Sequence, residues 1–395
     1  MSEHTSDLLE AAKAQASDVV ALRRDIHANP EIGLHLPGTQ QRILDSLTGL
    51  GLDITLGESL SSVVADLDTG KEGPTVLLRG DMDALPLTED TDVPFKSTIE
   101  GRMHACGHDT HVAMLVGAAK LLSENKSEFN GKVRFMFQPG EEGYHGAKFM
   151  IDEGVVDGVD RAFAIHVDSN SPLGIISSRP GAMAASSDEL EITVHGKGGH
   201  ASAPHVSVDP IAAAASITTG LYTMVTRDID VFDPALVTVA SIHGGTAGNI
   251  IPEIATMVGT IRTVSEATRE KVHTMITRVA QGIASAHGST ADVNIVKGYP
   301  VTVNDAAMVR LVESAVDTAL GEGRYLEALT PIMGSEDFSY VLQRVPGAMM
   351  SLGLCPEGYD NPFAAPSLHS NRAMLNEAGL PVGVAMHAAV AMARP

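Results

Sequence analysis

The sequence predicts an α/β protein whose main domain has a mostly parallel β-sheet with helices on both faces, and into which a smaller α+β domain is inserted. Along the first part of the chain, short apolar runs rich in β-branched residues alternate with longer stretches of helical period, which is typical of α/β architecture. Near Asp188 this pattern gives way to strand–helix–strand–strand–helix–strand, and from Asn304 the first alternation returns. An inserted domain explains both changes, since domain termini often lie close together.

The main domain is expected to begin with an amphipathic helix over residues 5–28, which Asn29 and Pro30 end. Its strands are expected at 62–67, 75–78, 133–137 and 161–165, and its further helices at 39–50, 110–125, 146–153 and from about 380. These strands read as continuous apolar runs, which is the pattern of a parallel sheet buried on both faces.

The inserted domain is expected to have the ferredoxin-like order βαββαβ. Its strands are expected at 190–195, 236–242, 255–263 and 292–297, and its helices at 208–227 and 266–287. We therefore place the inserted domain at residues 186–299, and the two halves of the main domain at 1–185 and 300–395.

Composition and charge exclude several classes of function. The 395 residues are 44% hydrophobic, which rules out disorder, and 27 basic against 49 acidic residues give a formal net charge of −22. Such a charge repels phosphate backbones and anionic lipids, so we expect neither a nucleic-acid nor a membrane partner. Two cysteines cannot form a disulfide framework. The first residues lack the basic and apolar regions of a signal peptide, and no apolar run approaches the length of a membrane span, so a cytoplasmic protein is expected.

Polar side chains follow three of the predicted strands at the point where each strand ends. Asp81 and Asp83 come just after the second strand, Glu141 and Glu142 just after the third, and His166 at the end of the fourth. In an open α/β sheet, ligands bind outside the carboxyl ends of the strands. The sequence therefore predicts that these side chains meet in one site.

Two further segments supply soft and imidazole donors. Cys106 and His108 flank Gly107, which permits a tight backbone, and His369 lies in a polar, proline-rich segment that is unsuited to a core helix. Cysteine, histidine and glutamate together suit zinc, manganese, cobalt or nickel. More than four candidate donors indicates two ions, which need a bridging ligand, either Cys106 or a water molecule. The remaining candidates are expected to have packing roles: His104, His111 and Cys355.

The adjacent residues Glu141 and Glu142 are expected to have different roles. Adjacent residues just past a strand point in different directions, so the two carboxylates are not expected to bind the same ion together. One of them should bind metal, and the other should face the space above it as a general base for a metal-activated water.

Nine segments, in this order, match a known family: LRRDIHANPE (22–31), LRGDMDALP (78–86), MHACGHDTH (103–111), FQPGEEG (137–143), AIHV (164–167), GKGGHASAPH (196–205), GTAGNIIP (245–252), GSEDFSY (334–340) and PSLHS (366–370). With these segments the chain resembles, over its whole length, the aminoacylase/carboxypeptidase metallopeptidases. Within them it is most similar to the N-acyl-amino-acid amidohydrolase branch, which includes hippurate hydrolases and indoleacetyl-amino-acid hydrolases.

The resemblance implies a dinuclear metal site in a catalytic domain that carries an inserted lid domain. The metal ligands that it implies, matched motif by motif, are Cys106, His108, Glu142, His166 and His369. It implies that Glu141 is the general base and that Asp83 orients the site. Better-known branches of this clan have a histidine ligand where this chain has Asp81, so Asp81 is not expected to be a ligand.

The resemblance also assigns roles to residues of the lid. His200 resembles a histidine that polarises the scissile carbonyl, often across a dimer interface, while Asn249 and Arg262 are candidates for binding the substrate carboxylate. Similar proteins form homodimers through the lid, and closure of the lid would exclude water from the site.

The predicted function is hydrolysis of an N-acyl or N-aroyl amino acid to a carboxylic acid and a free amino acid, with two divalent metal ions per chain. Alternatives on the same scaffold are a dipeptidase and an N-acetyl-diaminopimelate deacetylase. A binder of acyl amino acids without hydrolytic activity is a third alternative, but such a protein has no need of a base such as Glu141. A metal store is disfavoured, because its ligands would not need a lid.

Overall fold

The computed structural model describes residues 8–394, and in it the chain forms two compact units. The first unit comprises the residues up to Met183, Val303–Thr330 and those from Asp337 on. The second unit comprises Ala184–Thr302 and Pro331–Glu336. The catalytic and lid roles of the two units remain predictions.

The short segment at 331–336 groups with the second unit, whereas the sequence analysis places it in the main domain. The physical reason is backbone pairing. The N–H of Ala185 donates to the carbonyl oxygens of Ile332 and Gly334, at 3.0 and 2.9 Å, so the segment is tied to the start of the second unit.

The first unit is built on an eight-stranded sheet. Its strands are β1 (Asp53–Leu56), β2 (Val63–Asp68), β3 (Thr75–Asp81), β4 (Lys132–Gln138), β5 (Arg161–Asp168), β6 (Ile176–Ser178), β15 (Tyr325–Glu327) and β16 (Gly347–Gly353). The order is β1-β2-β4-β3-β5-β16-β6-β15. The central strands β4, β3, β5 and β16 are parallel, and so are β6 and β15, while β1–β2, β2–β4 and β16–β6 pair antiparallel. The predicted mostly parallel sheet is confirmed.

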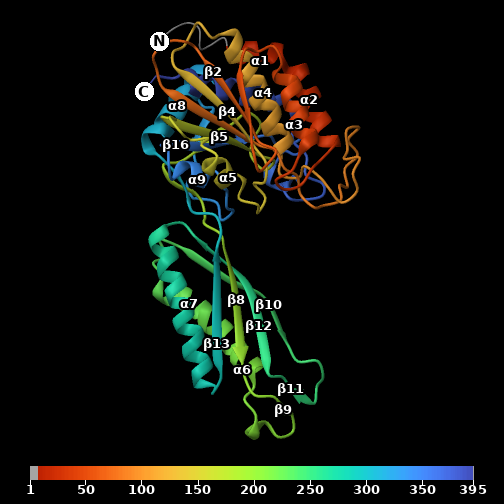
Figure 1. Cartoon of the computed structure of the whole chain (residues 1–395), viewed down its shortest axis with the longest axis vertical. Helices are drawn as coiled ribbons and strands as arrows, with labels where there is room; N and C mark the ends of the chain where they lie inside the picture. Colours follow the sequence, from red (N-terminus) through yellow and green to blue (C-terminus); the bar gives the residue numbers. More distant parts are fainter. Residues whose placement is uncertain (1–7, 395) are drawn as a thin grey trace. The chain divides into compact units, whose positions relative to one another are not determined.

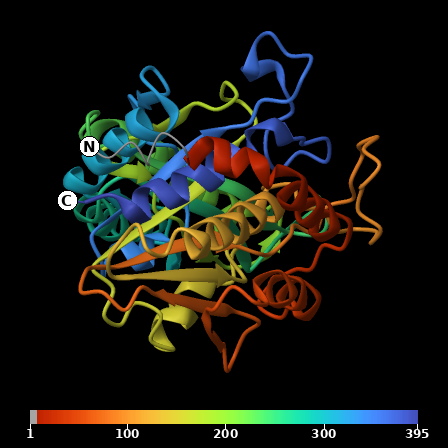
Figure 2. The same cartoon turned by 90° about the horizontal axis from the view of Figure 1, so that it is seen from above.

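Helices cover both faces of this sheet. One face carries α1 (Leu8–Ala14), α2 (Ala16–Ala28), α3 (Pro37–Leu47), α4 (His108–Glu124), α8 (Ala306–Leu320) and α10 (Leu380–Met392), and the other carries α5 (Gly146–Asp152) and α9 (Ser339–Leu342). Figure 2 shows α1, α2, α4 and α10 lying next to one another. Successive strand residues point to opposite faces of the sheet. Leu78 and Phe135 therefore pack in the core beneath α1, α2, α3, α4, α8 and α10, while Leu77 and Met136 pack in the core beneath α5 and α9. Burial on both faces explains why these strands are apolar throughout.

The single helix predicted over residues 5–28 is wrong in one respect. The structure has two helices there, because the chain turns at Gln15 between α1 and α2. The Gln15 side chain is buried, and its amide donates to the Gly117 carbonyl of α4 at 3.0 Å. The spacing of apolar residues does not reveal the turn at Gln15, because the apolar faces of both helices point to the core. Residues 5–7 lie outside the described residues.

The second unit has the predicted ferredoxin-like order. Its elements are β8 (Asp188–His195), α6 (Pro210–Asp228), β10 (Ala235–Gly244), β12 (Ile254–Thr263), α7 (Glu266–Ala286) and β13 (Thr290–Lys297). The antiparallel sheet has the order β10-β12-β8-β13, and α6 and α7 pack together on one face of it (Figure 1). Alternate residues of β8, such as Leu190 and Ile192, form the core with these helices.

Short elements complete the described residues. A two-stranded ribbon is formed by β9 (Gly199–His200) and β11 (Ile250–Ile251), and β7 (Gly181–Ala184) pairs with β14 (Thr302–Asn304). Single 3-10 turns are η2 (Pro204–Val206), η3 (Pro362–Ala364) and η4 (Glu377–Gly379). Within residues 8–394, no helix combines the length and the apolar character needed to cross a bilayer.

Candidate metal centre

Polar side chains gather at the carboxyl ends of three neighbouring strands in the first unit. Asp81 is the last residue of β3, Glu141 follows shortly after β4, and His166 lies near the end of β5. Because β4, β3 and β5 are adjacent and parallel, these ends meet at one edge of the sheet.

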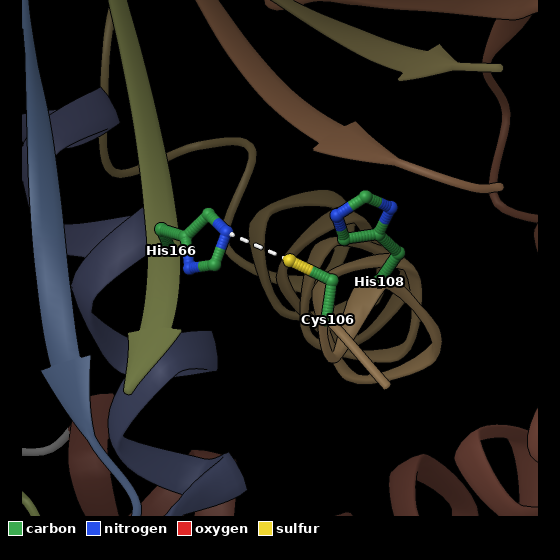
Figure 3. A group of neighbouring side chains, drawn as sticks. All are labelled: Cys106, His108 and His166. Atoms are coloured by element: carbon green, nitrogen blue, oxygen red, sulfur yellow. Dashed lines mark hydrogen bonds between the residues drawn. The ribbon is translucent and has the colours of Figure 1, made fainter. Parts of the chain in front are cut away.

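Cys106 and His108 lie at the start of α4, on the two sides of Gly107 (Figure 3). Gly107 has a φ of 84°, in the left-handed region, and a Cβ at this position would lie 2.5 Å from Cγ2 of Val167. Glycine is therefore required both by the backbone conformation and by the close approach of β5. The resulting turn presents both side chains towards the strand that carries His166.

The first donor group consists of Cys106, His108 and His166, whose ligand atoms all lie within 4.8 Å of one another. The Cys106 sulfur is 3.5 Å from Nε2 of His166, which points at it from β5 (Figure 3). Nδ1 of His166 is 2.7 Å from the Val167 carbonyl oxygen, an acceptor, so the ring proton is assigned to Nδ1. That assignment directs the lone pair of Nε2 towards the sulfur, the arrangement in which a histidine binds metal.

The environment of this group favours a cation. Both ring nitrogens of His108 are buried, and neither has a hydrogen-bond partner among the described residues, although each lies 3.5 Å from an oxygen of Asp81 or Asp83. Burial without partners is costly for such polar atoms, and coordination would satisfy one of them. Burial raises the pKa of the Cys106 thiol, but His108 and His166 more than offset this and bring the pKa to about 6. The thiolate is the form that binds metal.

The second donor group consists of Cys106, Glu142 and His369. Nε2 of His369 lies 3.3 Å from the Cys106 sulfur and 3.2 Å from Oε1 of Glu142. Hydrogen bonds with Cys106 and Glu142 raise the pKa of His369 to about 10, which shows how strongly the surrounding negative charge favours a positive one. The two donor groups therefore share one sulfur atom.

Asp83 holds the acidic turn after β4. One of its carboxylate oxygens accepts the N–H of Glu141 at 2.9 Å, and the other accepts the N–H of Glu142 at 3.0 Å. The two glutamates are thus presented from a fixed backbone. Glu142 belongs to the second donor group. Glu141 is buried, and with His108 and Glu142 it forms a further group whose ligand atoms lie within 4.8 Å of one another, so the division of roles between the two glutamates stays a prediction.

Asp81 has several buried partners, and with His108 and His111 it forms a further group whose ligand atoms lie within 4.8 Å of one another. Its exclusion from the ligands stays a prediction. Nη1 of Arg79 donates to one carboxylate oxygen at 2.6 Å, and Nδ1 of His111 lies 2.5 Å from the other. Nε2 of His111 in turn accepts the N–H of Val167 at 2.9 Å. Burial raises the pKa of Asp81, but Arg79 and the neighbouring histidines hold it well below its usual range. Asp81 and His111 thereby link β3, α4 and β5 behind the donor groups.

Sequence reasoning missed the centre of this network, Arg79. Its side chain is 1% exposed, and besides Asp81 it contacts Asp337 (Nη2 to Oδ1, 3.0 Å) and Gln138 (Nε to Oε1, 2.9 Å). The side-chain amide of Gln138 also donates to Asp337, at 2.8 Å. An arginine inside an otherwise apolar strand could have indicated buried carboxylates, since a buried charge needs partners.

The second unit brings together two of its three predicted residues. His200 and Asn249 line the same open hollow of about 420 Å³ beside the β9–β11 ribbon. Nδ1 of His200 accepts the backbone N–H of Ser202 at 3.1 Å, so its proton is assigned to Nε2. Arg262 lies at the other end of β12 from Ile254, roughly 25 Å along the strand, where its Nη1 donates to Ser335 Oγ at 3.0 Å.

Comparison with known proteins identifies the family to which the chain is similar. The model of peptidase family M20/M25/M40 matches residues 77–393. Thermostable carboxypeptidase 2 of Saccharolobus solfataricus is 40% identical over 98% of this chain and 98% of its own. IAA-amino acid hydrolase ILR1-like 2 of Arabidopsis thaliana is 40% identical over 99% of this chain and 89% of its own.

Among solved structures, the Bacillus subtilis YXEP protein is described as a dinuclear metal binding peptidase from the M20 family. It is 32% identical, covers 96% of this chain and 98% of its own, and superposes with a TM-score of 0.84. The resemblance drawn from the nine sequence segments is confirmed, and so is the prediction of a hydrolase that acts on amides. The chain belongs to peptidase family M20/M25/M40.

Proposed function

We propose that this protein hydrolyses N-acyl amino acids to a carboxylic acid and a free amino acid, with two divalent metal ions. The observation that carries the proposal is the pair of donor groups that share the Cys106 sulfur, beside a buried carboxylate, Glu141, that the second group does not use.

The proposed ligands are Cys106, His108 and His166 for the first ion, and Cys106, Glu142 and His369 for the second. The buried nitrogens of His108, which make no hydrogen bond within residues 8–394 although carboxylates lie 3.5 Å away, and the directed lone pair of His166 support this set. Thiolate, imidazole and carboxylate donors suit zinc, manganese, cobalt or nickel, and availability decides among them as much as affinity does.

Glu141 is the proposed general base. Divalent ions, when bound, polarise the amide carbonyl and lower the pKa of water to about 7 in favourable cases. Glu141 then takes a proton from the attacking water and delivers it to the leaving amide nitrogen. Asp83 holds the backbone of Glu141 and Glu142 in place, by accepting one backbone N–H from each.

The second unit is the proposed lid. With its Nδ1 accepting the N–H of Ser202, His200 carries a proton on Nε2 that it can donate to the oxygen of the scissile carbonyl. Asn249 and Arg262 are proposed to bind the substrate carboxylate, and their separation within one lid means that at most one of them can do so together with His200 of the same chain.

A homodimer through the lid is also proposed. The second unit exposes apolar side chains on β10 and on α6, where isolated surface residues would be expected to be polar: Leu236, Ile242, Ile211 and Tyr222. Leu236 and Ile242 lie on opposite faces of the sheet, because Ile242 pairs with the core residue Met257 whereas Val237, the neighbour of Leu236, is itself in the core. The proposed dimer therefore rests on the family resemblance and not on one apolar patch.

The identity of the substrate rests on the relatives. One is named as a hydrolase of IAA-amino acids, which are acyl amino acids, and another as a carboxypeptidase. The second name keeps cleavage of peptides, such as a dipeptide, as the alternative function.

Metal content and hydrolysis, measured together, test the proposal. We expect about two ions per chain, release of free amino acid from N-acetyl- or N-benzoyl-amino acids, loss of activity on chelation and recovery on adding metal back. Preferential cleavage of simple dipeptides would favour the alternative. Metal without any hydrolysis would leave a binding protein, and metal-free protein after careful purification would overturn the proposal.

A further inference from the structure

We propose that Asn170 is a positioning residue whose side-chain amide clamps the loop that carries His369 and thereby sets the affinity of the second metal site. The inference rests on the proposed function, since it needs two ions. The loop, called here the His369 loop, comprises residues 356–372.

His369 is the donor with the weakest local support. Its side chain is 56% exposed, against 15% for Glu142 of the same donor group. Its backbone has a φ of 65°, which an L-residue rarely adopts and which the surroundings must enforce. The loop before it is largely at the surface, and Phe363 is 85% exposed. Burial therefore contributes little to holding His369 in place.

Three side-chain hydrogen bonds hold the loop before His369 in place. Nδ2 of Asn170 donates to the carbonyl oxygens of Pro362 and Ala365, both at 2.9 Å, and the hydroxyl of Ser169 donates to the Pro366 carbonyl at 3.0 Å. Within the described residues, these are the hydrogen bonds that join positions 356–368 to the rest of the first unit. The next anchor along the chain is the N–H of His369 itself, which donates to the Ala105 carbonyl at 2.9 Å.

The clamp is attached to the strand that carries His166, one member of the first donor group. Asn170 is the second residue after β5, and its own N–H donates to Oδ1 of Asp168 at 2.8 Å. His166 lies on the same strand end. A short, hydrogen-bonded path therefore runs from His166 to Asn170 and across to the His369 loop, in addition to the direct bond from the His369 N–H to the Ala105 carbonyl.

The chemistry of the clamp requires a donor. Both hydrogens of the Asn170 amide are used, one for each carbonyl, so aspartate, which only accepts, would face two carbonyl oxygens without a hydrogen. The donors of the first group lie outside the loop: His108 and His166 lie on α4 and β5, and Cys106 lies in the turn before α4. The bond from the His369 N–H to the Ala105 carbonyl, which links this turn to the loop, does not involve Asn170. Loss of the clamp should therefore lower the affinity for the second ion and leave the affinity for the first ion unchanged.

Titration of metal-free, full-length protein with Co²⁺ tests this prediction in the variant Asn170→Ala. Groups that hydrogen-bond a metal ligand directly typically contribute about 10–100-fold to metal affinity, and Asn170 acts one step further away, through the loop. We expect the first equivalent to bind as in the wild type, with its thiolate-to-cobalt absorption band, and the second to bind more weakly by a factor of about 10. Excess Co²⁺ should restore the second equivalent and the turnover, which a merely structural defect would not allow.

Two variants serve as comparisons. Asn361→Ala makes the same change in the same loop, but Asn361 accepts only from the N–H of Phe363 nearby, so it should bind cobalt like the wild type. Ser169→Ala should weaken the second equivalent in the same direction but less than Asn170→Ala, and it carries the test if Asn170→Ala does not fold.

The outcomes separate the clamp from the proposed function. If the wild type binds two equivalents and Asn170→Ala binds both equally tightly, the clamp is wrong and the function stands. Equal loss of both equivalents would also overturn the clamp, because its effect would not be confined to one ion. Failure of the wild type to bind cobalt would overturn the proposed function itself.

Discussion

The two units hold their proposed reactive side chains in opposite ways. In the first unit, His108 and Glu141 are buried, and Asp83 fixes the turn after β4 from a neighbouring strand. In the second unit, His200 is exposed, and the partner that orients it, Ser202, lies in the same turn. A side chain held from several strands keeps its geometry, whereas one held locally can shift at little cost. We therefore propose that the first unit carries out the bond-breaking step and that the second unit adapts to the substrate.

The largest expected effect comes from removing the base on the rigid side. Glu141→Gln keeps the size of the side chain but cannot accept the proton, so kcat should fall by about 10²–10⁴-fold. Metal content should stay unchanged, because neither proposed ion needs Glu141, and inductively coupled plasma analysis beside steady-state kinetics checks both. Glu142→Gln is the matched control and should lose metal as well as activity. A wild-type rate in Glu141→Gln would remove this residue from the mechanism.

Next in size is the loss of the buried cation that supports the rigid site. Arg79→Met leaves the carboxylates of Asp81 and Asp337 buried without their cation and should lower the free energy of unfolding by about 3–5 kcal/mol. Arg134→Met is the control, since the pair of Arg134 with Asp66 is more exposed and should contribute less than half as much. Urea denaturation measures both variants. Equal losses of unfolding free energy in the two variants would show that the buried ion pairs of Arg79 contribute no more than the more exposed pair of Arg134.

For the exposed His200 of the second unit, we expect a large loss of activity with little loss of stability. His200→Ala should lower kcat by about 10²–10³-fold through loss of a donor to the carbonyl oxygen. Its free energy of unfolding should change by only about 0.5 kcal/mol or less, because the side chain is exposed. Kinetics and urea denaturation of one preparation test the prediction. A large loss of stability would mean that His200 is as structural as the residues of the first unit.

The smallest expected effect concerns a buried ion pair in the second unit, which resembles the buried contacts of the first unit. Asp188 accepts from Arg269 at 2.5 Å and lies 2.6 Å from Nε2 of His273. Burial raises the pKa of Asp188, but hydrogen bonds with His273 and Arg269 bring it to about 2. A carboxyl with a lowered pKa stabilises the fold above its ordinary value of 3.8, and this stability is lost as the pH falls from about 4 towards 2.

This contribution should amount to about 2 kcal/mol. The difference in unfolding free energy between wild type and Asp188→Asn, measured by urea denaturation over this pH range, should shrink as the pH is lowered. A difference that is constant with pH would mean that Asp188 does not titrate as the structure indicates.

Local patterns predicted the second unit more completely than the first. The six long elements of its βαββαβ core lie in one contiguous stretch, and each has a clear period of two or of 3.6 residues, so this order follows from the sequence alone. In the first unit, β1, β6, β15 and β16 have no matching segment in the prediction, and three of them are only three or four residues long. Short strands owe their pairing to neighbours from distant parts of the chain, which periodicity does not report.

The same limit applies to the site. Strand-end positions placed Asp83, Glu141 and His166 together, because parallel strands bring their carboxyl ends to one edge. The partner of Arg79 could not be found in this way, since Asp337 lies 258 residues further along the chain and no local pattern connects the two. The role of Asn170 is equally invisible in sequence, because its acceptors are backbone carbonyls.

The position of β16 has a consequence for how the chain acquires this fold. β16 lies between β5 and β6 in the sheet, although the whole contiguous part of the second unit separates it from them in sequence. During synthesis, the hydrogen-bonding edge of β5 stays uncovered until Gly347–Gly353 has left the ribosome, whereas the elements of the second unit are all available once Lys297 has emerged. An uncovered strand edge is a template for pairing with other chains. The nascent protein therefore passes through a stage in which its inserted unit can fold while its main sheet is still open to aggregation.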